Sequence, residues 1–292
     1  MRKSIPHSVI RVLFLVAVAA PAAAEVSWDF SLEPEWTPLF QGVDYYGFEL
    51  DDPRMMQGHA VRVDTRAEGV SFFATPPDEG GEREVLSRKG SSFLTEFGLQ
   101  VAVNASPFGP TGVSEGEAQH IWGLHVYRGQ LVSPHHTNRP AFALTRDNEP
   151  FFIEYGAGYD DAYYALTGFY MILEDGKAVV DPEERIGRGT RQVHPRTAIG
   201  VCEDSRLVYL LVVDGRRPGY SEGAETMEMA ALLRLLGAHN GMNFDGGGSS
   251  TLVVEGEDGE PRLLNTPIYR REPGTERPVG NHLGIRADRL QD

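Results

Sequence analysis

The chain has 292 residues, of which 41% are hydrophobic and 10% aromatic, a composition typical of a globular protein. Its net charge of -15 at pH 7 argues against nucleic acid or an anionic membrane surface as a main partner. The single cysteine, Cys202, excludes an internal disulfide bond and a zinc site built from cysteines. Because Cys202 ends an apolar run that starts at Thr197, we expect a buried and unreactive thiol.

The first 24 residues have the pattern of a secretory signal peptide. Three basic residues precede an apolar run over 12–20, which leads to small residues at 22–24. This run is too short to span a bilayer, and no later stretch is long enough for a transmembrane segment. We therefore expect an exported protein, periplasmic or secreted, with a membrane anchor at the N-terminus as the alternative. Loss of the three basic residues would change the net charge to -18.

Short strands are predicted along most of the remaining chain. A polar segment at 75–88 with paired prolines and glycines predicts an exposed loop, and 91–97 predicts a short helix. Seven apolar residues in a row at 207–213 predict a central strand that is covered on both faces. Other apolar runs predict strands at 61–63, 70–74, 99–104, 121–125, 141–145, 151–153, 170–173 and 178–180.

One amphipathic helix is predicted at 226–236. Its apolar residues recur at i, i+3, i+4 and i+7 from Met229 to Leu236, and Gly237 supplies a C-terminal stop. Its N-terminal cap would have to be Glu225 or the first helical residue. With so few helices and no repeat or linker, the sequence predicts one α+β domain of mixed β-sheets over 25–292.

The stretch 240–255 places a carboxylate and a glycine run between two apolar strands. Asp245 ends the first strand, and Gly246, Gly247, Gly248 and Ser249 follow it. Consecutive glycines let a ligand approach the backbone closely, and their N–H groups can form a nest for an anion. A flexible hairpin loop is the structural alternative.

Asp214 stands in a similar place, after the apolar run 207–213 and before a glycine. Strand ends are where a sheet presents catalytic carboxylates, although an Asp-Gly pair can also be a plain turn. Arg196 and Arg216 could bind a phosphate or carboxylate in bidentate fashion, or form salt bridges with these aspartates. Glu228, in the first turn of the predicted helix, is a third candidate carboxylate.

No motif predicts a cofactor or a metal. The glycine run lacks the Lys-Ser/Thr pair of a P-loop, no HExxH motif is present, and 255–260 lacks the spacing of a calcium loop. The pair His135-His136 lies in a polar segment and is predicted to be surface residues rather than ligands. A divalent cation is therefore not supported by the spacing.

Several spaced motifs share one order along the chain: HPRTA at 194–198, DGR at 214–216, LGA at 236–238 and NFDGGGSS at 243–250. With Ser221, Gly223 and Glu228, they resemble the phosphodiester glycosidase family, which includes the lysosomal uncovering enzyme of animals. The resemblance covers about 101–287. It also matches Asn104 to the family's strand-end asparagine and Asn281 and Leu283 to its closing strand. Pro107 departs from the family's usual aromatic pair.

The resemblance implies hydrolysis of a sugar joined through its anomeric carbon to a phosphodiester, on a glycan or glycolipid-like substrate. A phosphomonoester leaves easily because its second pKa is about 6, so strong general acid catalysis is less necessary. Candidates for nucleophile, base or stabiliser are Asp245, Asp214 and Glu228. Substrate- or phosphate-binding candidates are Arg196, Arg216, Asn104, His194, Thr197, Ser221, Gly246, Gly247, Gly248 and Ser249.

Two other functions fit the same sequence. A phosphodiesterase would cleave the P–O bond and would favour a metal bound by the carboxylates. A non-catalytic module would bind glycans of the cell envelope without turnover. The sequence predicts no oligomeric state.

Overall fold

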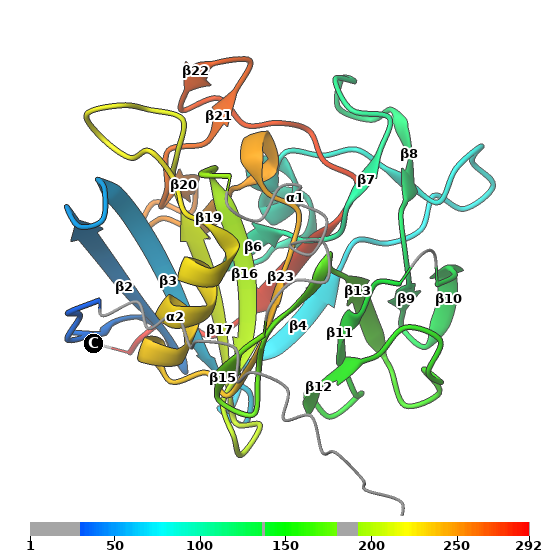
Figure 1. Ribbon diagram of the computed structural model, residues 1–292. Coiled ribbons are helices and arrows are strands. Elements are labelled where there is room, and N and C mark those ends of the chain that lie inside the picture. Colours follow the sequence, from blue (N-terminus) through cyan, green and yellow to red (C-terminus); the bar gives the residue numbers. More distant parts are fainter. Residues whose placement is uncertain (1–29, 136–137, 180–191, 292) are drawn as a thin grey trace, which may run out of the picture.

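A computed structural model describes residues 30–135, 138–179 and 192–291 (Figure 1). The predicted signal peptide, His136 and residue 180 lie outside these ranges. Within them, no helix is long and apolar enough to cross a membrane.

The largest sheet has eight strands, and every pair of neighbours in it is antiparallel. The strand order is β1-β2-β3-β17-β16-β18-β14-β15. The strands are β1 (Thr37–Phe40), β2 (Val43–Leu50), β3 (Met56–Asp64), β14 (Tyr170–Glu174), β15 (Lys177–Ala178), β16 (Arg196–Val201), β17 (Leu207–Val213) and β18 (Asn240–Asn243).

A second sheet packs on one face of the first and is also antiparallel. Its order is β20-β19-β6-β23-β4. These strands are β4 (Ser71–Ala74), β6 (Val101–Asn104), β19 (Leu252–Glu255), β20 (Pro261–Leu263) and β23 (His282–Arg286). Helix α2 (Thr226–Leu236) covers the outer face of the first sheet, and α1 (Gly90–Phe97) covers the outer face of the second (Figure 1). The result is a layered helix–sheet–sheet–helix arrangement.

A third antiparallel sheet, of order β10-β9-β13-β11-β12, lies to the right in Figure 1. Apolar side chains of β11 and β13 join the core between the first two sheets. Its strands are β9 (His125–Tyr127), β10 (Gln130–Ser133), β11 (Ala141–Leu144), β12 (Pro150–Ile153) and β13 (Tyr164–Thr167). Small sheets are formed by β5 (Val85–Leu86), β7 (Phe108–Gly109) and β8 (Ala118–Ile121), and by β21 (Ile268–Tyr269) with β22 (Glu272–Pro273).

Strand β17 is the central strand that its seven apolar residues predict. It lies between β3 and β16, and residues 208–213 are all buried. Successive side chains point to opposite faces of a strand, so Leu210 enters the core between the sheets while Leu211 packs under α2. Both faces are covered, which is why the pattern is continuous rather than alternating.

Helix α2 also has the predicted bounds. Its N-terminus carries a capping box: the side chain of Glu225 accepts the backbone N–H of Glu228, and the side chain of Glu228 accepts the backbone N–H of Glu225. Gly237 ends the helix with a left-handed φ of 110°. Glutamate therefore replaces the usual Ser or Thr of the box as the capping residue.

Three details differ from the expectations. The ladders between named strands are antiparallel rather than mixed, because the connections are hairpins and loops and only two α-helices occur in the described residues. The predicted strand at 121–125 is wrong, since it spans the turn between β8 and β9, where Gly123 has a φ of 147°. Cys202 is only partly buried, in the turn after β16.

The Cys202 thiol is held by that turn. Its Sγ donates to Asp204 at 2.9 Å and accepts the N–H of Leu207 at 2.9 Å. Burial and the neighbouring carboxylate raise the pKa of the thiol, so it stays protonated at neutral pH.

Leu210→Asp should prevent stable folding, because it loses the burial of a side chain with no exposed surface and leaves a charge unpaired in the core. We expect a loss of about 4 kcal/mol or more, comparable to the whole stability of many domains. Urea unfolding measures this loss in the free energy of unfolding. Leu131→Asp on the exposed strand β10 is the control, and a cooperatively melting Leu210→Asp protein would contradict the assignment.

Candidate active site

Asp245 lies where β18 ends and the 3-10 helix η2 (Gly247–Ser249) begins. Its backbone is fixed on both sides. Its N–H donates to Ala105 O at 2.9 Å, and its carbonyl accepts the side-chain amide of Asn104 at 2.6 Å. The side-chain oxygen of Asn104, Oδ1, in turn accepts hydrogen bonds from Thr197 Oγ1 at 2.8 Å and from the N–H of Thr251 at 3.1 Å. Asn104, which is itself held by Thr197, therefore fixes the backbone position of Asp245.

The Asp245 side chain is partly buried among polar groups. Burial raises the pKa of its carboxyl, against the hydrogen bond of Ser249, the charges of Arg277 and Arg139, and the N–H of Gly246. Burial prevails, so the pKa lies above its ordinary value. Such a carboxylate is a stronger proton acceptor than one in water.

The glycine run brings an arginine close to the backbone. Gly247 has a φ of 65°, and a Cβ there would lie 2.8 Å from Nη2 of Arg216. The Gly247 N–H donates to Pro195 O at 2.8 Å, so this N–H group of the predicted nest is used within the protein.

A cavity of about 540 Å³ is lined by Gly248, three residues after Asp245, and by several arginines. Arg277 Nη1 donates to Ser249 Oγ at 3.2 Å, and the charge of Arg277 and the Ser249 hydroxyl both act to lower the pKa of Asp245. Arg216 and Arg277 both line this cavity, and burial together with the charge of Arg277 lowers the pKa of Arg216. The cavity is lined by Arg216, Gly248, Ile268, Tyr269, Arg270, Arg271 and Arg277.

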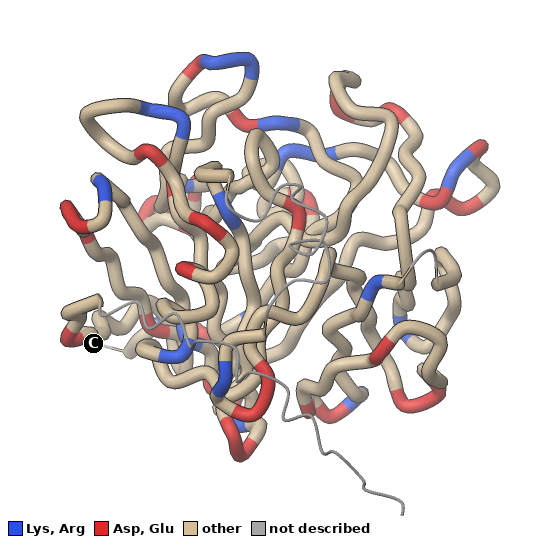
Figure 2. The backbone as a smooth tube through the Cα atoms, in the orientation of Figure 1, with Lys and Arg blue, Asp and Glu red and all other residues tan. Residues whose placement is uncertain are grey.

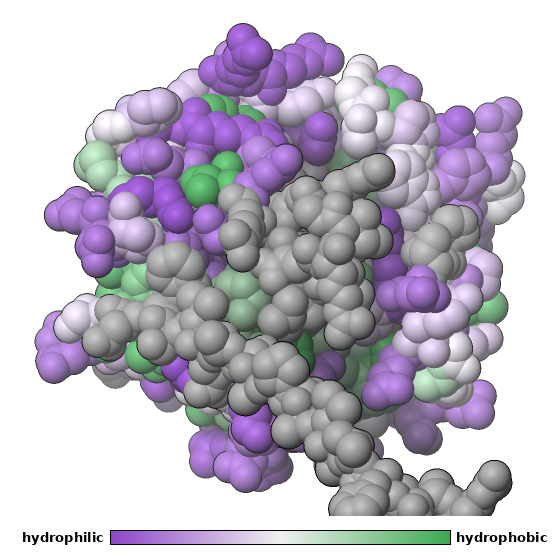
Figure 3. Space-filling view, viewed as in Figure 1, coloured by the Kyte–Doolittle hydropathy of each residue, from purple (hydrophilic) through white to green (hydrophobic). Residues whose placement is uncertain are grey.

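The basic residues come from two loops that lie far apart in the chain. Figure 2 shows blue segments at the tip of the β21–β22 hairpin and in the loop between β17 and α2. In Figure 3, hydrophilic side chains cover the top of this face, where Figure 1 places β21 and β22. The sequence motifs pointed to Arg216 but missed Arg270, Arg271 and Arg277. The available signal was the density of arginine at 270–277.

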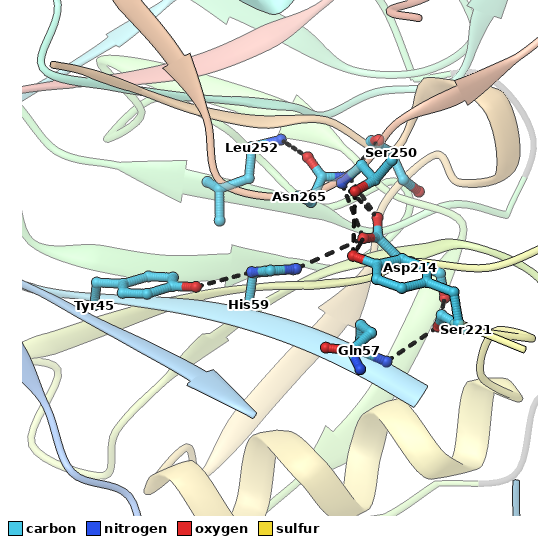
Figure 4. A network of polar contacts seen from close by, with 10 residues as sticks. Tyr45, Gln57, His59, Asp214, Ser221, Ser250, Leu252 and Asn265 are labelled. Carbon is cyan, nitrogen blue, oxygen red and sulfur yellow. Dashed lines mark hydrogen bonds and ion pairs between the residues drawn. The ribbon is translucent and has the colours of Figure 1, made fainter. Parts of the chain in front are cut away.

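Asp214 is buried in a network of polar contacts (Figure 4). Its carboxylate accepts the amide of Asn265 at 2.9 Å, the N–H of Thr266 at 2.9 Å and the hydroxyl of Tyr220 at 3.0 Å. His59 Nε2 lies 3.6 Å away, and Tyr45 bonds the other ring nitrogen of His59. Burial acts to raise the pKa of Asp214, but His59 and these donors outweigh it and hold the pKa below its ordinary value.

The remaining predicted carboxylate, Glu228, is fully buried at the start of α2. It pairs with Arg54 at 2.5 Å and accepts the N–H of Glu225 at 2.7 Å. These contacts explain the residue as a helix cap with a paired charge. Its second oxygen, Oε1, has no hydrogen-bond partner among the described residues.

Three other predicted binding residues hold the loops around the site. Arg196 donates to the backbone carbonyls of Ala224 and Gln192, at 3.1 and 2.6 Å. Ser221 donates to the carbonyl of Asp214 at 2.6 Å. His194 bonds Gln192 at 3.0 Å, and burial together with the charges of Arg216 and Arg196 lowers the pKa of its imidazole. His194 is therefore neutral at pH 7 and lies near the basic cavity.

The described ranges contain no group of three or more His, Cys, Asp or Glu residues placed to hold a metal ion. His135 instead bonds the carbonyl of Ala157 at 3.2 Å.

A family model of phosphodiester glycosidases matches residues 97–286, well over half of the chain and all of the elements that carry Asp245 and the basic cavity. The chain belongs to the phosphodiester glycosidase family. The match begins and ends close to the range over which the sequence motifs resemble this family. No curated protein matches the chain.

Solved structures share the fold of this chain at low sequence identity. A hypothetical protein from Synechocystis has a TM-score of 0.65 and 16% identity, over 84% of this chain. The chain spans 62% of that protein's length. The zebrafish N-acetylglucosamine-1-phosphodiester alpha-N-acetylglucosaminidase catalytic domain, auto-inhibited by its pro-peptide, has a TM-score of 0.61 and 20% identity, over 85% of this chain and 84% of that one. A putative exported protein from Burkholderia pseudomallei has a TM-score of 0.57 and 15% identity, over 79% and 74%.

Asp214→Asn should destabilise the protein at pH 7 by about 2 kcal/mol, because a buried acceptor of several hydrogen bonds loses its charge. A carboxyl with a lowered pKa stabilises the fold above its unfolded pKa of about 3.9, and this contribution is lost as the pH falls through the folded pKa. The difference between variant and parent should therefore shrink in acid. Urea unfolding between pH 7 and pH 3 measures it, and a gap that widens in acid would contradict the assignment.

Proposed function

We propose that this protein is an exported enzyme that hydrolyses the glycosidic bond of a sugar-1-phosphodiester and releases free sugar and a phosphomonoester. The single observation that carries this proposal is an arginine-lined cavity at the glycine run that follows Asp245, where Arg277 also donates to Ser249. Membership of the family supports the reaction class. The signal-like pattern of the first 24 residues supports export.

The phosphate of the substrate fits between Arg216 and Arg277. A phosphodiester carries one negative charge, and Asp245 beside it carries a second. Two negative groups repel at this distance unless cations lie between them. Arg216 and Arg277 both act electrostatically on Asp245, so they can neutralise the pair and bind the phosphate oxygens.

Asp245 is then the carboxylate at the anomeric carbon. Water adds to that carbon, the C1–O bond breaks, and its electron pair leaves on the phosphate oxygen. The proton lost by the water balances the charge, and the raised pKa of Asp245 suits a group that accepts it. As base on this water, Asp245 gives inversion of the anomeric configuration. As nucleophile, its oxygen instead bonds C1 first while the C1–O bond to phosphate breaks; water then adds to C1, releases the carboxylate, loses its proton to solvent and gives retention. The anomer first released, followed by proton NMR, distinguishes these two routes.

Asp214 and Glu228 serve this reaction as positioning residues. The oxygens of Asp214 are occupied by Asn265, Thr266 and Tyr220, while Glu228 is paired with Arg54. Asn265 extends the support, since its side chain holds the N–H of Leu252 at 2.8 Å and the carbonyl of Ser250 at 3.1 Å (Figure 4). The η2–β19 connection beside Asp245 is thereby fixed.

Asp245→Asn should lower kcat by about a thousandfold and leave the melting temperature close to that of the parent, because the proton acceptor is lost from a partly buried site. Steady-state kinetics on a sugar-1-phosphodiester measure it. Asp175→Asn, which changes a highly exposed aspartate in a hairpin turn, is the matched control. Parental turnover by Asp245→Asn would disprove the site assignment.

Arg216→Ala and Arg277→Ala should each weaken the binding of inorganic phosphate and raise KM by about tenfold, as the loss of one charge-assisted contact predicts.

Reaction in oxygen-18 water tests which bond breaks, because glycosidase chemistry places the label in the sugar. Label in the phosphate would favour a phosphodiesterase. Binding without turnover would favour a glycan-binding module.

A further inference from the structure

The basic cavity carries more positive charge than one phosphodiester requires. Arg277 donates to Ser249, and the guanidinium of Arg216 lies against Gly247, so these two arginines lie at the glycine run beside Asp245, where the reacting phosphate is proposed to bind. Arg270 and Arg271 line the same cavity from the exposed tip of the β21–β22 hairpin. Since two cations already balance the phosphodiester and Asp245, the second pair has no counter-charge from the proposed reaction.

The second pair of arginines occupies an unfavourable turn. Tyr269 pairs with Glu272, so Arg270 and Arg271 are the two residues of a tight hairpin loop. Their φ angles are 51° and 67°. Positive φ at both positions is the pattern of a type I′ turn, which strongly prefers Asn-Gly, because bulky L-residues seldom adopt this conformation.

Two other hairpins of the same chain show what the turn normally uses. The β9–β10 and β14–β15 loops also have positive φ at both positions, and their sequences are Arg128-Gly129 and Asp175-Gly176. Both have glycine second, where the β21–β22 hairpin has Arg271. Unfavourable backbone conformations persist mainly where function requires the residue.

The ring of Tyr269 contacts one arginine of the second pair and one arginine of the inner pair. The guanidinium of Arg270 lies 5.1 Å from the centroid of its ring, and that of Arg277 lies 5.3 Å away. These cation–π contacts hold an outer and an inner arginine against one aromatic ring. The hairpin thereby extends the phosphate-binding surface outward from Arg277.

We infer that Arg270 and Arg271 form a second anion subsite, which binds a further phosphate on the aglycone side of the substrate. The inference rests on the proposed function for the place of the reacting phosphate. The substrate class is then a sugar-1-phosphodiester whose aglycone is itself phosphorylated. The subsite is exposed, so salt screens it more strongly than the inner pair.

The test replaces the turn without destroying it. The double variant Arg270→Asn/Arg271→Gly introduces the sequence that a type I′ turn prefers, so the hairpin should persist and the melting temperature should not fall. Calorimetry should show tripolyphosphate binding weakened by about tenfold or more, and orthophosphate binding weakened by less than about threefold. Arg128→Asn removes one arginine from a turn of the same type outside the cavity, and it should leave both affinities unchanged.

A kinetic experiment separates this inference from the proposed function. The two substrates are sugar-1-phosphates esterified to methanol and to glycerol phosphate. The double variant should raise KM about tenfold more for the glycerol phosphate ester than for the methyl ester, with similar kcat values. If the parent cleaves neither ester, the proposed function fails, and the tripolyphosphate measurement still decides the subsite. Equal losses for tripolyphosphate and orthophosphate, or no loss of either, would overturn the inference.

Discussion

One buried amide, that of Asn104, connects the parts of the protein that form the site. Asn104 ends β6 in the second sheet, and its side chain bonds Thr197 on β16 of the first sheet. The same side chain holds the carbonyl of Asp245 and the N–H of Thr251. Buried polar groups of this kind are costly unless every donor and acceptor is paired, so the amide fixes the relative position of the two sheets.

Two of the three candidate carboxylates have partners within the protein. Asp214 accepts hydrogen bonds from Asn265, Thr266 and Tyr220, and one oxygen of Glu228 pairs with Arg54. Asp245 differs, because its carboxylate faces cations that also line an open cavity. The distribution of partners thus supports the proposal that Asp214 and Glu228 position the loops and that Asp245 acts on the substrate.

The cavity also accounts for how an acidic protein can bind an anion. The net charge of -15 repels anions at long range, but four arginines line one cavity and concentrate positive charge, and with it an attractive field for anions, at that place. Low-dielectric walls strengthen this field at the partly buried Arg277 more than at the exposed hairpin tip. Local charge, rather than total charge, therefore decides what this surface can bind.

The sequence by itself determined the features that depend on neighbours along the chain. The continuous apolar run of β17, the periodicity of α2 and the spaced family motifs all lie within short windows, where pattern reports burial directly. Tertiary structure alone decided which groups are paired, because the partners of Asn104, Asp214 and Glu228 lie up to 174 residues away. It also brought Arg277 beside Asp245, since the relative place of two loops depends on how the sheets stack and not on local sequence.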